Sequence, residues 1–170
     1  KLAKSKNEIS VSKLAEKNAK QSLTQKLIQS DTNNNLIDKL SIKFNLNSNI
    51  DLIEVYDNSH IQGTDSIGAL ICFGNEGFVK KRYRKFNIKD EKIKNDDYGM
   101  MKEVLFRRFS KAIKEKSGSL SLPDLILVDG GKGQYSVSRE ILNELGLHDL
   151  PILAVAKGKR RNAGEEKIYY

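Results

Sequence analysis

The chain has 170 residues, of which 38% are hydrophobic and 31% are charged, and its formal net charge at pH 7 is +8. Such a length and composition are typical of one globular domain with a real core. No apolar run approaches the roughly 18 residues that a membrane span needs, so we expect no membrane partner. The single cysteine, Cys72, excludes an internal disulfide and a cysteine-rich zinc site, and a reducing, cytoplasmic location is expected. The positive charge favours polyanionic partners without identifying them.

Residues 1–48 are expected to form a helical extension or linker that precedes the main domain. A helix is predicted over 11–29, because its apolar residues approximate one stripe at helical spacing. These residues are Val11, Leu14, Ala15, Ala19, Leu23, Leu27 and Ile28. A polar break is predicted at 30–35 and a shorter helix at 36–40. The main domain is then placed at 49–170.

The main domain is predicted to begin with three strands. The first covers 52–56 and ends at Asp57, and the second, 67–73, is almost continuously apolar, as central strands are. The residues 74–77 predict a hairpin turn. The third strand, 78–88, is rich in lysine and arginine and resembles a protected or nucleic-acid-facing edge.

Helices and strands alternate in the rest of the chain. A helix is predicted from 95 to about 116, a short buried strand ends at Asp129, and a second helix covers 134–145. Another buried strand is predicted at 152–156, and a further strand starts at 167. The order predicts an α/β fold, in which helices flank a hairpin-rich mixed sheet.

Three aspartates stand at the ends of predicted elements. Asp57 and Asp129 each follow an apolar strand, and Asp97 opens a helix. Carboxylates that converge at a sheet edge repel one another unless a cation lies between them, and their hard oxygens suit Mg²⁺ or Mn²⁺. Two such ions could activate water for phosphodiester hydrolysis. Each acid taken alone is equally typical of a helix cap or a turn residue.

The remaining polar motifs are less specific. The Gly-Gly-Lys-Gly turn at 130–133 could surround a phosphate with backbone amides, but its spacing is not that of a P-loop. The run 157–161 holds four basic residues in five, which would lie beside Asp57 and Asp129 if the strands are parallel. His60 follows the first strand closely, whereas His148 is expected to be solvated. No arrangement of residues supports covalent catalysis.

Several segments together resemble the C-terminal endonuclease domain of the UvrC family. The matching segments, in chain order, are Val-Tyr-Asp-Asn-Ser-His-Ile-Gln-Gly (55–63), Tyr-Arg-Lys-Phe-Asn-Ile (83–88), Asn-Asp-Asp-Tyr-Gly-Met (95–100), Pro-Asp-Leu-Ile-Leu-Val-Asp-Gly-Gly-Lys-Gly-Gln (123–134) and Ala-Val-Ala-Lys-Gly (154–158). The segment 14–19 also looks like the helix that precedes that domain. The match follows the order and spacing of the family over nearly the whole chain.

The resemblance implies an RNase H-like fold and the 5′ incision of nucleotide excision repair. By matched position, Asp57, Asp97 and Asp129 would be the catalytic, metal-binding acids, with Asp97 preferred to Asp96 as the second acid of its pair. It also implies damaged double-stranded DNA and the UvrB protein as partners. Asn58 replaces the usual isoleucine of the family. A later histidine and tandem helix-hairpin-helix motifs, which the family carries, are not among these residues, so a C-terminally truncated domain is expected.

The leading hypothesis is therefore a metal-dependent endonuclease that uses Mg²⁺ or Mn²⁺. Basic side chains would hold the DNA phosphates, and the candidates are Lys132, Lys157, Lys159, Arg160 and Arg161. A non-catalytic nucleic-acid-binding module, in which the acids are caps, is the alternative. It predicts salt-sensitive DNA binding that does not depend on metal. A nucleotide-binding domain built on 130–133 is a weaker third hypothesis.

Overall fold

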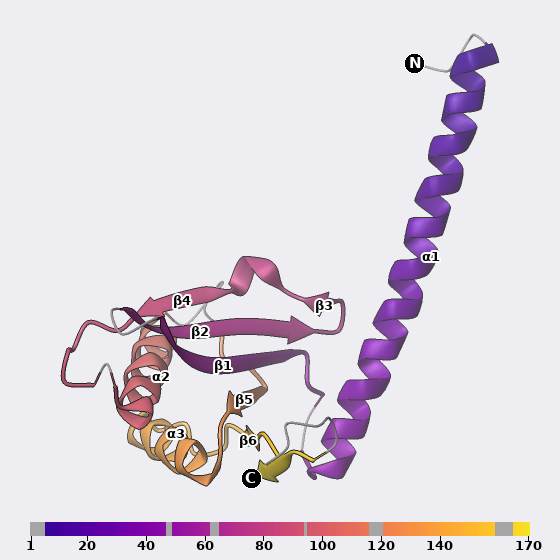
Figure 1. Cartoon of the computed structure of the whole chain (residues 1–170). Coiled ribbons are helices and arrows are strands. Elements are labelled where there is room, and N and C mark those ends of the chain that lie inside the picture. Colours follow the sequence, from indigo (N-terminus) through magenta and orange to yellow (C-terminus); the bar gives the residue numbers. More distant parts are fainter. Residues whose placement is uncertain (1–5, 47–48, 62–64, 94, 116–120, 159–164) are drawn as a thin grey trace.

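A computed structural model describes residues 6–46, 49–61, 65–93, 95–115, 121–158 and 165–170. In chain order the elements are α1 (Lys6–Lys43), β1 (Leu52–Ile61), β2 (Asp65–Gly74), β3 (Gly77–Phe78), the 3-10 turn η1 (Lys80–Arg82), β4 (Arg84–Asn87), α2 (Asp97–Lys114), β5 (Leu125–Asp129), α3 (Lys132–Glu144), β6 (Ile152–Ala156) and β7 (Lys167–Tyr169). The long helix α1 projects away from an α/β domain that contains all the other elements (Figure 1).

The described strands form one mixed sheet in the order β3-β2-β1-β5-β6-β7, and β4 also pairs with β2. β1 and β2 are an antiparallel hairpin, whereas β1, β5 and β6 run parallel. α3 connects β5 to β6, as a parallel pair requires. β7 returns antiparallel to β6. The predicted α/β fold with a mixed sheet and flanking helices is confirmed.

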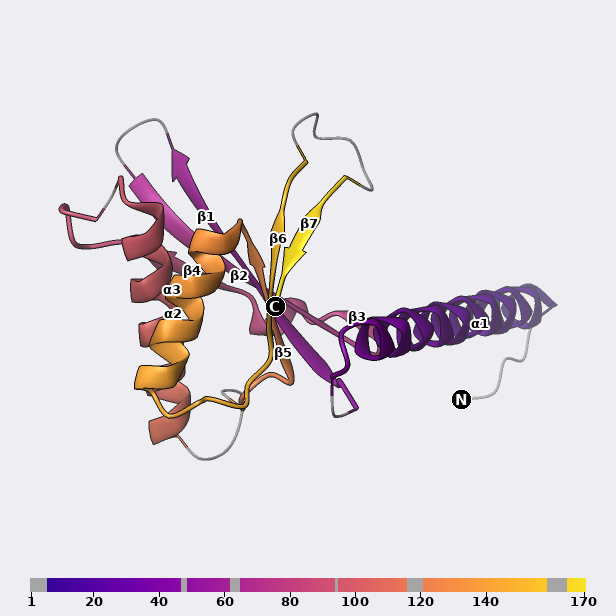
Figure 2. The same ribbon diagram turned by 90° about the horizontal axis from the view of Figure 1, so that it is seen from below.

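The two faces of the sheet are covered differently. α2 and α3 lie side by side on one face, which we call the helix face (Figure 2). There the apolar stripe of α2, including Met101, Leu105 and Phe109, packs against Tyr56 and Val128 of the strands. On the opposite face, which we call the open face, a second cluster joins the end of α1 to the sheet. Its buried members are Ile37, Phe44, Ile50, Ile53, Leu125 and Leu153.

The predicted break at 30–35 is wrong, because α1 continues through it to Lys43. The segment contains no proline or glycine, and Ser, Asp, Thr and Asn cost at most about 0.7 kcal/mol each relative to alanine in a helix. Thr32 Oγ1 donates to the Ile28 carbonyl at 2.9 Å, within the helix. Asn33 is buried, and its Nδ2 donates to the Asn75 carbonyl at 3.5 Å. The polar side chain of Asn33 therefore serves a tertiary contact with the β2–β3 turn and does not interrupt the helix.

The apolar stripe predicted for 11–29 does not face a core. Among the described residues of that stripe, Val11, Leu14, Leu23, Leu27 and Ile28 are between 58% and 65% exposed. The buried apolar contact between α1 and the domain comes from its last turns, near Ile37 and Phe44.

The third predicted strand, 78–88, is divided by η1 into β3 and β4. The turn begins where the Val79 amide donates to the Cys72 carbonyl at 2.8 Å. It directs Arg82 away from the sheet, and the guanidinium donates to the Ser121 carbonyl at 3.0 Å. Where the sequence predicted one continuous strand, the chain thus turns at η1 and Arg82 contacts the loop before β5.

Candidate functional site

Asp57 and Asp129 lie on neighbouring parallel strands. The pairing of β1 with β5 brings Tyr56 opposite Val128, so the two aspartates that follow stand next to each other. Side chains alternate between the two faces along a strand, so Asp57 lies on the same face as Ile53, and Asp129 lies on the same face as Leu125. Ile53 and Leu125 belong to the open-face cluster, and both carboxylates therefore project from the open face. The structure thus brings two of the three predicted acids side by side.

The two carboxylates influence each other electrostatically. The pKa of Asp57 is raised, first because partial burial removes water from the carboxylate and second because of the negative charge of Asp129. The ammonium of Lys157 acts in the opposite direction. The pair thus carries negative charge that a cation on the open face would relieve.

The sequence predicted that the first strand ends at Asp57, and this prediction is wrong. β1 continues to Ile61, and residues 57–61 pair with 65–69 of β2. The polar residues after Asp57 resembled a turn, but β2 satisfies their backbone groups while Asp57 and Ser59 remain exposed to water. Asp57 instead marks the point where β1 extends beyond the end of its parallel neighbour β5.

Lys157, the residue after β6, contacts one acid of this pair directly. Its Nζ lies 2.6 Å from Asp129 Oδ2, with the lysine side chain 64% exposed and the aspartate 30% exposed. A pair this open to solvent contributes little to stability, about 0–1 kcal/mol. Beside it a shallow groove runs over the open face, lined in part by Val55, Leu127, Val155 and Glu166. Sequence reasoning did not single out Glu166, which directly precedes β7 and lines this groove together with Asp129 and Lys157.

Asp97 begins α2 on the other layer of the domain. The cap of the helix is Asp96, whose Oδ1 accepts from the Tyr98 amide at 3.0 Å, so Asp97 is the first helical residue and is exposed. The cap role that was the alternative for Asp97 belongs to its neighbour. Asn58 Nδ2 donates to the Asp97 carbonyl at 3.2 Å and ties this helix start to β1.

The three aspartates are close in the fold without forming one compact ligand group. Asn58 alternates with Asp57 along β1, so the tether to Asp97 lies on the helix face while Asp57 projects from the open face. Within the described ranges, no three His, Cys, Asp or Glu side chains gather closely enough to hold a metal ion. The structure brings Asp57 and Asp129 together and places Asp97 at the adjoining helix start.

The Gly-Gly-Lys-Gly turn uses two of its amides internally. The Gly130 amide donates to the Val155 carbonyl at 3.0 Å, and the Gly131 amide donates to Gln134 Oε1 at 3.2 Å. These two groups are therefore engaged in holding the start of α3, which argues against a phosphate cradle there. α3 begins at Lys132, two residues before the predicted start, and Lys132 is exposed beside the end of β5.

Some predicted residues cannot be placed relative to the acids. Lys159, Arg160 and Arg161 lie outside the described residues, and of His60 only the backbone is described, within β1. His148 is exposed in the loop after α3, where its Nδ1 lies 3.3 Å from Asn143 Oδ1. Its predicted solvation is confirmed.

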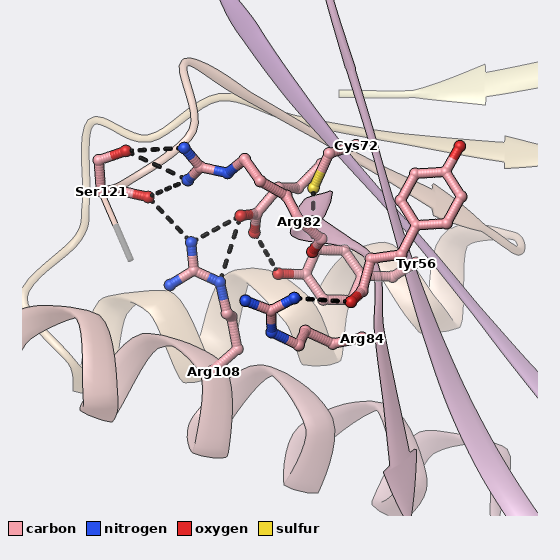
Figure 3. A network of polar contacts seen from close by, with 8 residues as sticks. Tyr56, Cys72, Arg82, Arg84, Arg108 and Ser121 are labelled. Carbon is pink, nitrogen blue, oxygen red and sulfur yellow. Dashed lines mark hydrogen bonds and ion pairs between the residues drawn. The ribbon is translucent and has the colours of Figure 1, made fainter. Parts of the chain in front are cut away.

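A buried ionic network under the site was missed by the sequence reading (Figure 3). Glu54 is 1% exposed and Arg108 is 4% exposed. Arg108 donates to Glu54 Oε1 through Nη2 at 2.6 Å and Nε at 3.2 Å, and Nη2 also donates to the Ser121 carbonyl at 2.9 Å. Tyr56 donates to Glu54 Oε2 at 2.6 Å. A glutamate inside an apolar strand was the one available signal.

This network connects the helix face to the site strand. Glu54 lies three residues before Asp57 on β1, and Arg108 lies on α2, the helix that begins at Asp97. The hydroxyl of Tyr56 stays protonated, because burial first and the charge of Glu54 second raise its pKa well above the ordinary value. The network therefore fixes α2 against β1 at one end, and Asn58 fixes it at the other.

Comparison with protein families gives a match over residues 41–170 to the UvrC RNase H endonuclease domain. The chain belongs to this family. Membership establishes the RNase H-like fold that the motifs implied.

The UvrABC system protein C of Cereibacter sphaeroides is 49% identical over 158 residues, covering 91% of this chain and 25% of that protein. The protein of the same name from Hyphomonas neptunium is 50% identical over 160 residues, covering 91% and 26%. The chain thus spans about a quarter of these relatives.

Solved structures with some likeness are endonucleases V. The catalytic domain of human endonuclease V has a TM-score of 0.41 and 20% identity, covering 65% of this chain and 46% of that one. A Ciona intestinalis endonuclease V in complex with DNA has a TM-score of 0.42 and 13% identity, covering 79% and 58%. In the described part of the chain, no helix combines the length and apolar character needed to cross a bilayer.

Proposed function

We propose that the chain is a metal-dependent DNA endonuclease domain of excision repair that makes the 5′ incision. The observation that carries the proposal is the pair of adjacent carboxylates, Asp57 and Asp129, on the open face of the sheet. Membership in a family of endonuclease domains supports the reaction class, and the name of the relatives supports excision repair.

The donor set suits Mg²⁺ or Mn²⁺. Asp57 and Asp129 offer hard oxygen ligands whose mutual repulsion a divalent cation would remove, and Asp97 would contribute from the start of α2. When bound, such an ion supplies Lewis-acid stabilisation of the phosphodiester oxygens and lowers the pKa of water. Lys157, which contacts Asp129, would hold a phosphate of the DNA beside the two acids.

The residues of the chain would otherwise bind and orient the substrate. Lys132 and Lys157 lie at the ends of the elements that flank Asp129, where they would contact phosphates. The same role is proposed for Lys159, Arg160 and Arg161, which follow β6 in the sequence. Damaged double-stranded DNA is the proposed substrate and UvrB the proposed partner, and for both the support is the family.

A calorimetric titration with Mn²⁺ tests the proposal on the chain itself. The wild type should bind Mn²⁺, and Asp57→Asn should weaken binding by more than about tenfold, since it removes a charged ligand. Asp149→Asn, an exposed acid in the loop after α3, is the matched control and should bind like the wild type. Equal Mn²⁺ affinity in all three proteins would overturn the metal site. Salt-sensitive DNA binding without Mn²⁺ binding would instead support the non-catalytic module.

A further inference from the structure

A basic residue lies across the sheet from the two acids, on the side opposite Lys157. In the antiparallel register, Asp57 stands opposite Ala69 of β2, and Ala69 stands opposite Lys85 of β4. On the other side Asp129 stands opposite Val155 of β6. One row of side chains therefore crosses five strands of the sheet.

All members of this row project from the open face. Residues in register share a face, and their neighbours confirm the direction. Phe86, next to Lys85, packs in the helix-face cluster, and Leu70, next to Ala69, is buried there too. Lys85 and Ala69 themselves are exposed. Lys85 is thus exposed on the same face as the two carboxylates.

The distance across the row decides what Lys85 can contact. Two strand spacings of about 4.8 Å separate the backbones at Asp57 and Lys85, or roughly 10 Å. That separation does not favour an ion pair with Asp57, and Lys85 makes no ion pair or side-chain hydrogen bond within the described part of the chain. By contrast, Lys157 on the other flank is held by Asp129.

A small, exposed side chain lies between Asp57 and Lys85 in this row. It belongs to Ala69, whose single methyl group leaves the sheet accessible. Half-buried Ile71 and Val55 continue it as a smooth apolar floor. Among the described residues of this row, only the methyl group of Ala69 stands between Asp57 and the lysine.

We propose that Lys85 binds a backbone phosphate of the DNA strand whose scissile phosphate meets Asp57 and Asp129, with Ala69 as the floor of the path between them. This inference rests on the proposed function and adds a direction to it, because the strand would cross the sheet from β6 toward β4. A span of roughly 10 Å places the contacted phosphate within a few nucleotides of the acids on the same strand.

Charge and position on the chain support a nucleic-acid strand as the occupant. The segment from η1 through β4 contributes Lys80, Lys81 and Arg84 as further exposed basic residues, and no acid interrupts it. Arg84 is directed elsewhere, since its Nη1 donates to the carbonyls of Lys81 and Tyr83. Lys85 is therefore the basic side chain of β4 that faces the row.

Anisotropy titrations of a fluorescein-labelled DNA duplex between about 50 and 200 mM salt test the proposal. Lys85→Gln should reduce the slope of log K against log salt by roughly 0.9, the value for one lost phosphate contact, and Lys85→Arg should restore it. Lys114→Gln is the matched control, because it removes the same charge from an exposed site on α2, in the layer behind the sheet. Ala69→Glu, which adds a carboxylate to the floor, should also weaken binding.

Equal slopes for Lys85→Gln and Lys114→Gln would overturn the contact, and a neutral Ala69→Glu would overturn the path. The Mn²⁺ titration of the same variants separates this inference from the proposed function. Lys85→Gln should bind Mn²⁺ like the wild type. If Lys85→Gln leaves the salt slope unchanged while the wild type binds Mn²⁺, only the path is refuted. If Lys85→Gln reduces the salt slope but the wild type binds no Mn²⁺, the endonuclease site is refuted.

Discussion

Replacing Arg108 with methionine should destabilise the protein strongly. The variant keeps most of the apolar stem but leaves the Glu54 carboxylate, 1% exposed, without its cation. Removing one partner of a buried pair costs about 3–5 kcal/mol, because the remaining charge has lost its water and gains nothing in return. The carbonyl of Ser121 loses the bond from Arg108 as well and keeps the bond from Arg82.

The expected loss is large enough to measure in two ways. For a chain of this size each kcal/mol lowers the melting temperature by about 2–4 °C, so Arg108→Met should melt about 6–20 °C below the wild type. Urea unfolding followed by circular dichroism should show a lower midpoint with an unchanged slope. Lys111→Met, which removes a 64% exposed partner of Glu115 on the same helix, should cost less than about 1 kcal/mol.

The double variant Glu54→Gln with Arg108→Met distinguishes a charge effect from a packing effect. It removes both charges while the amide can still accept from Tyr56, so we expect a cost of about 1–3 kcal/mol, smaller than the sum of the single variants. An Arg108→Met cost under about 1 kcal/mol, or strict additivity in the double variant, would refute the reasoning that the buried charge dominates.

Three further results are expected. Gly68→Ala should cost about 1–3 kcal/mol in urea unfolding, because its new methyl group would overlap buried Val104, and Val104→Ala should recover part of that loss; a neutral Gly68→Ala would contradict the packing. Asp124→Ala should cost about 1–3 kcal/mol, since Oδ2 accepts from the amides of Asp51 and Leu52 at 2.9 Å each, and Asp124→Asn should cost less. Burial raises the pKa of the Cys72 thiol to about 11, so a thiol reagent at pH 8 should label it only as fast as the protein unfolds. Rapid labelling of the native protein would show that Cys72 is accessible.

Much of the secondary structure follows from local sequence. Apolar runs bounded by turn residues predicted β2, β5 and β6, and helical spacing with acidic starts predicted α2. The errors occur where a distant contact overrides local preference. α1 passes through its polar segment, where buried Asn33 meets the β2–β3 turn, and Arg82 interrupts a basic strand to reach Ser121.

The candidate site shows the same division. Strand ends and a helix start in the sequence selected Asp57, Asp97 and Asp129, and the family motifs selected the same three residues. Asp57 and Asp129 lie side by side because β1 pairs in parallel with β5. These two segments are about 70 residues apart in the chain. The assignment of a catalytic and metal-binding role to the three acids stays a prediction.

The sequence by itself determined the family, the chemical types available for a site and the order of elements from β5 to β7. Only the tertiary structure decided which face of the sheet each side chain occupies. The reason is that side chains alternate along a strand, so a shift of one residue in pairing moves a whole strand's side chains to the other face. The register placed Asp57 in one row with Asp129 and Lys85 on the open face and turned Glu54 inward to Arg108. These partners are distant in the chain, and no local pattern encodes their pairing.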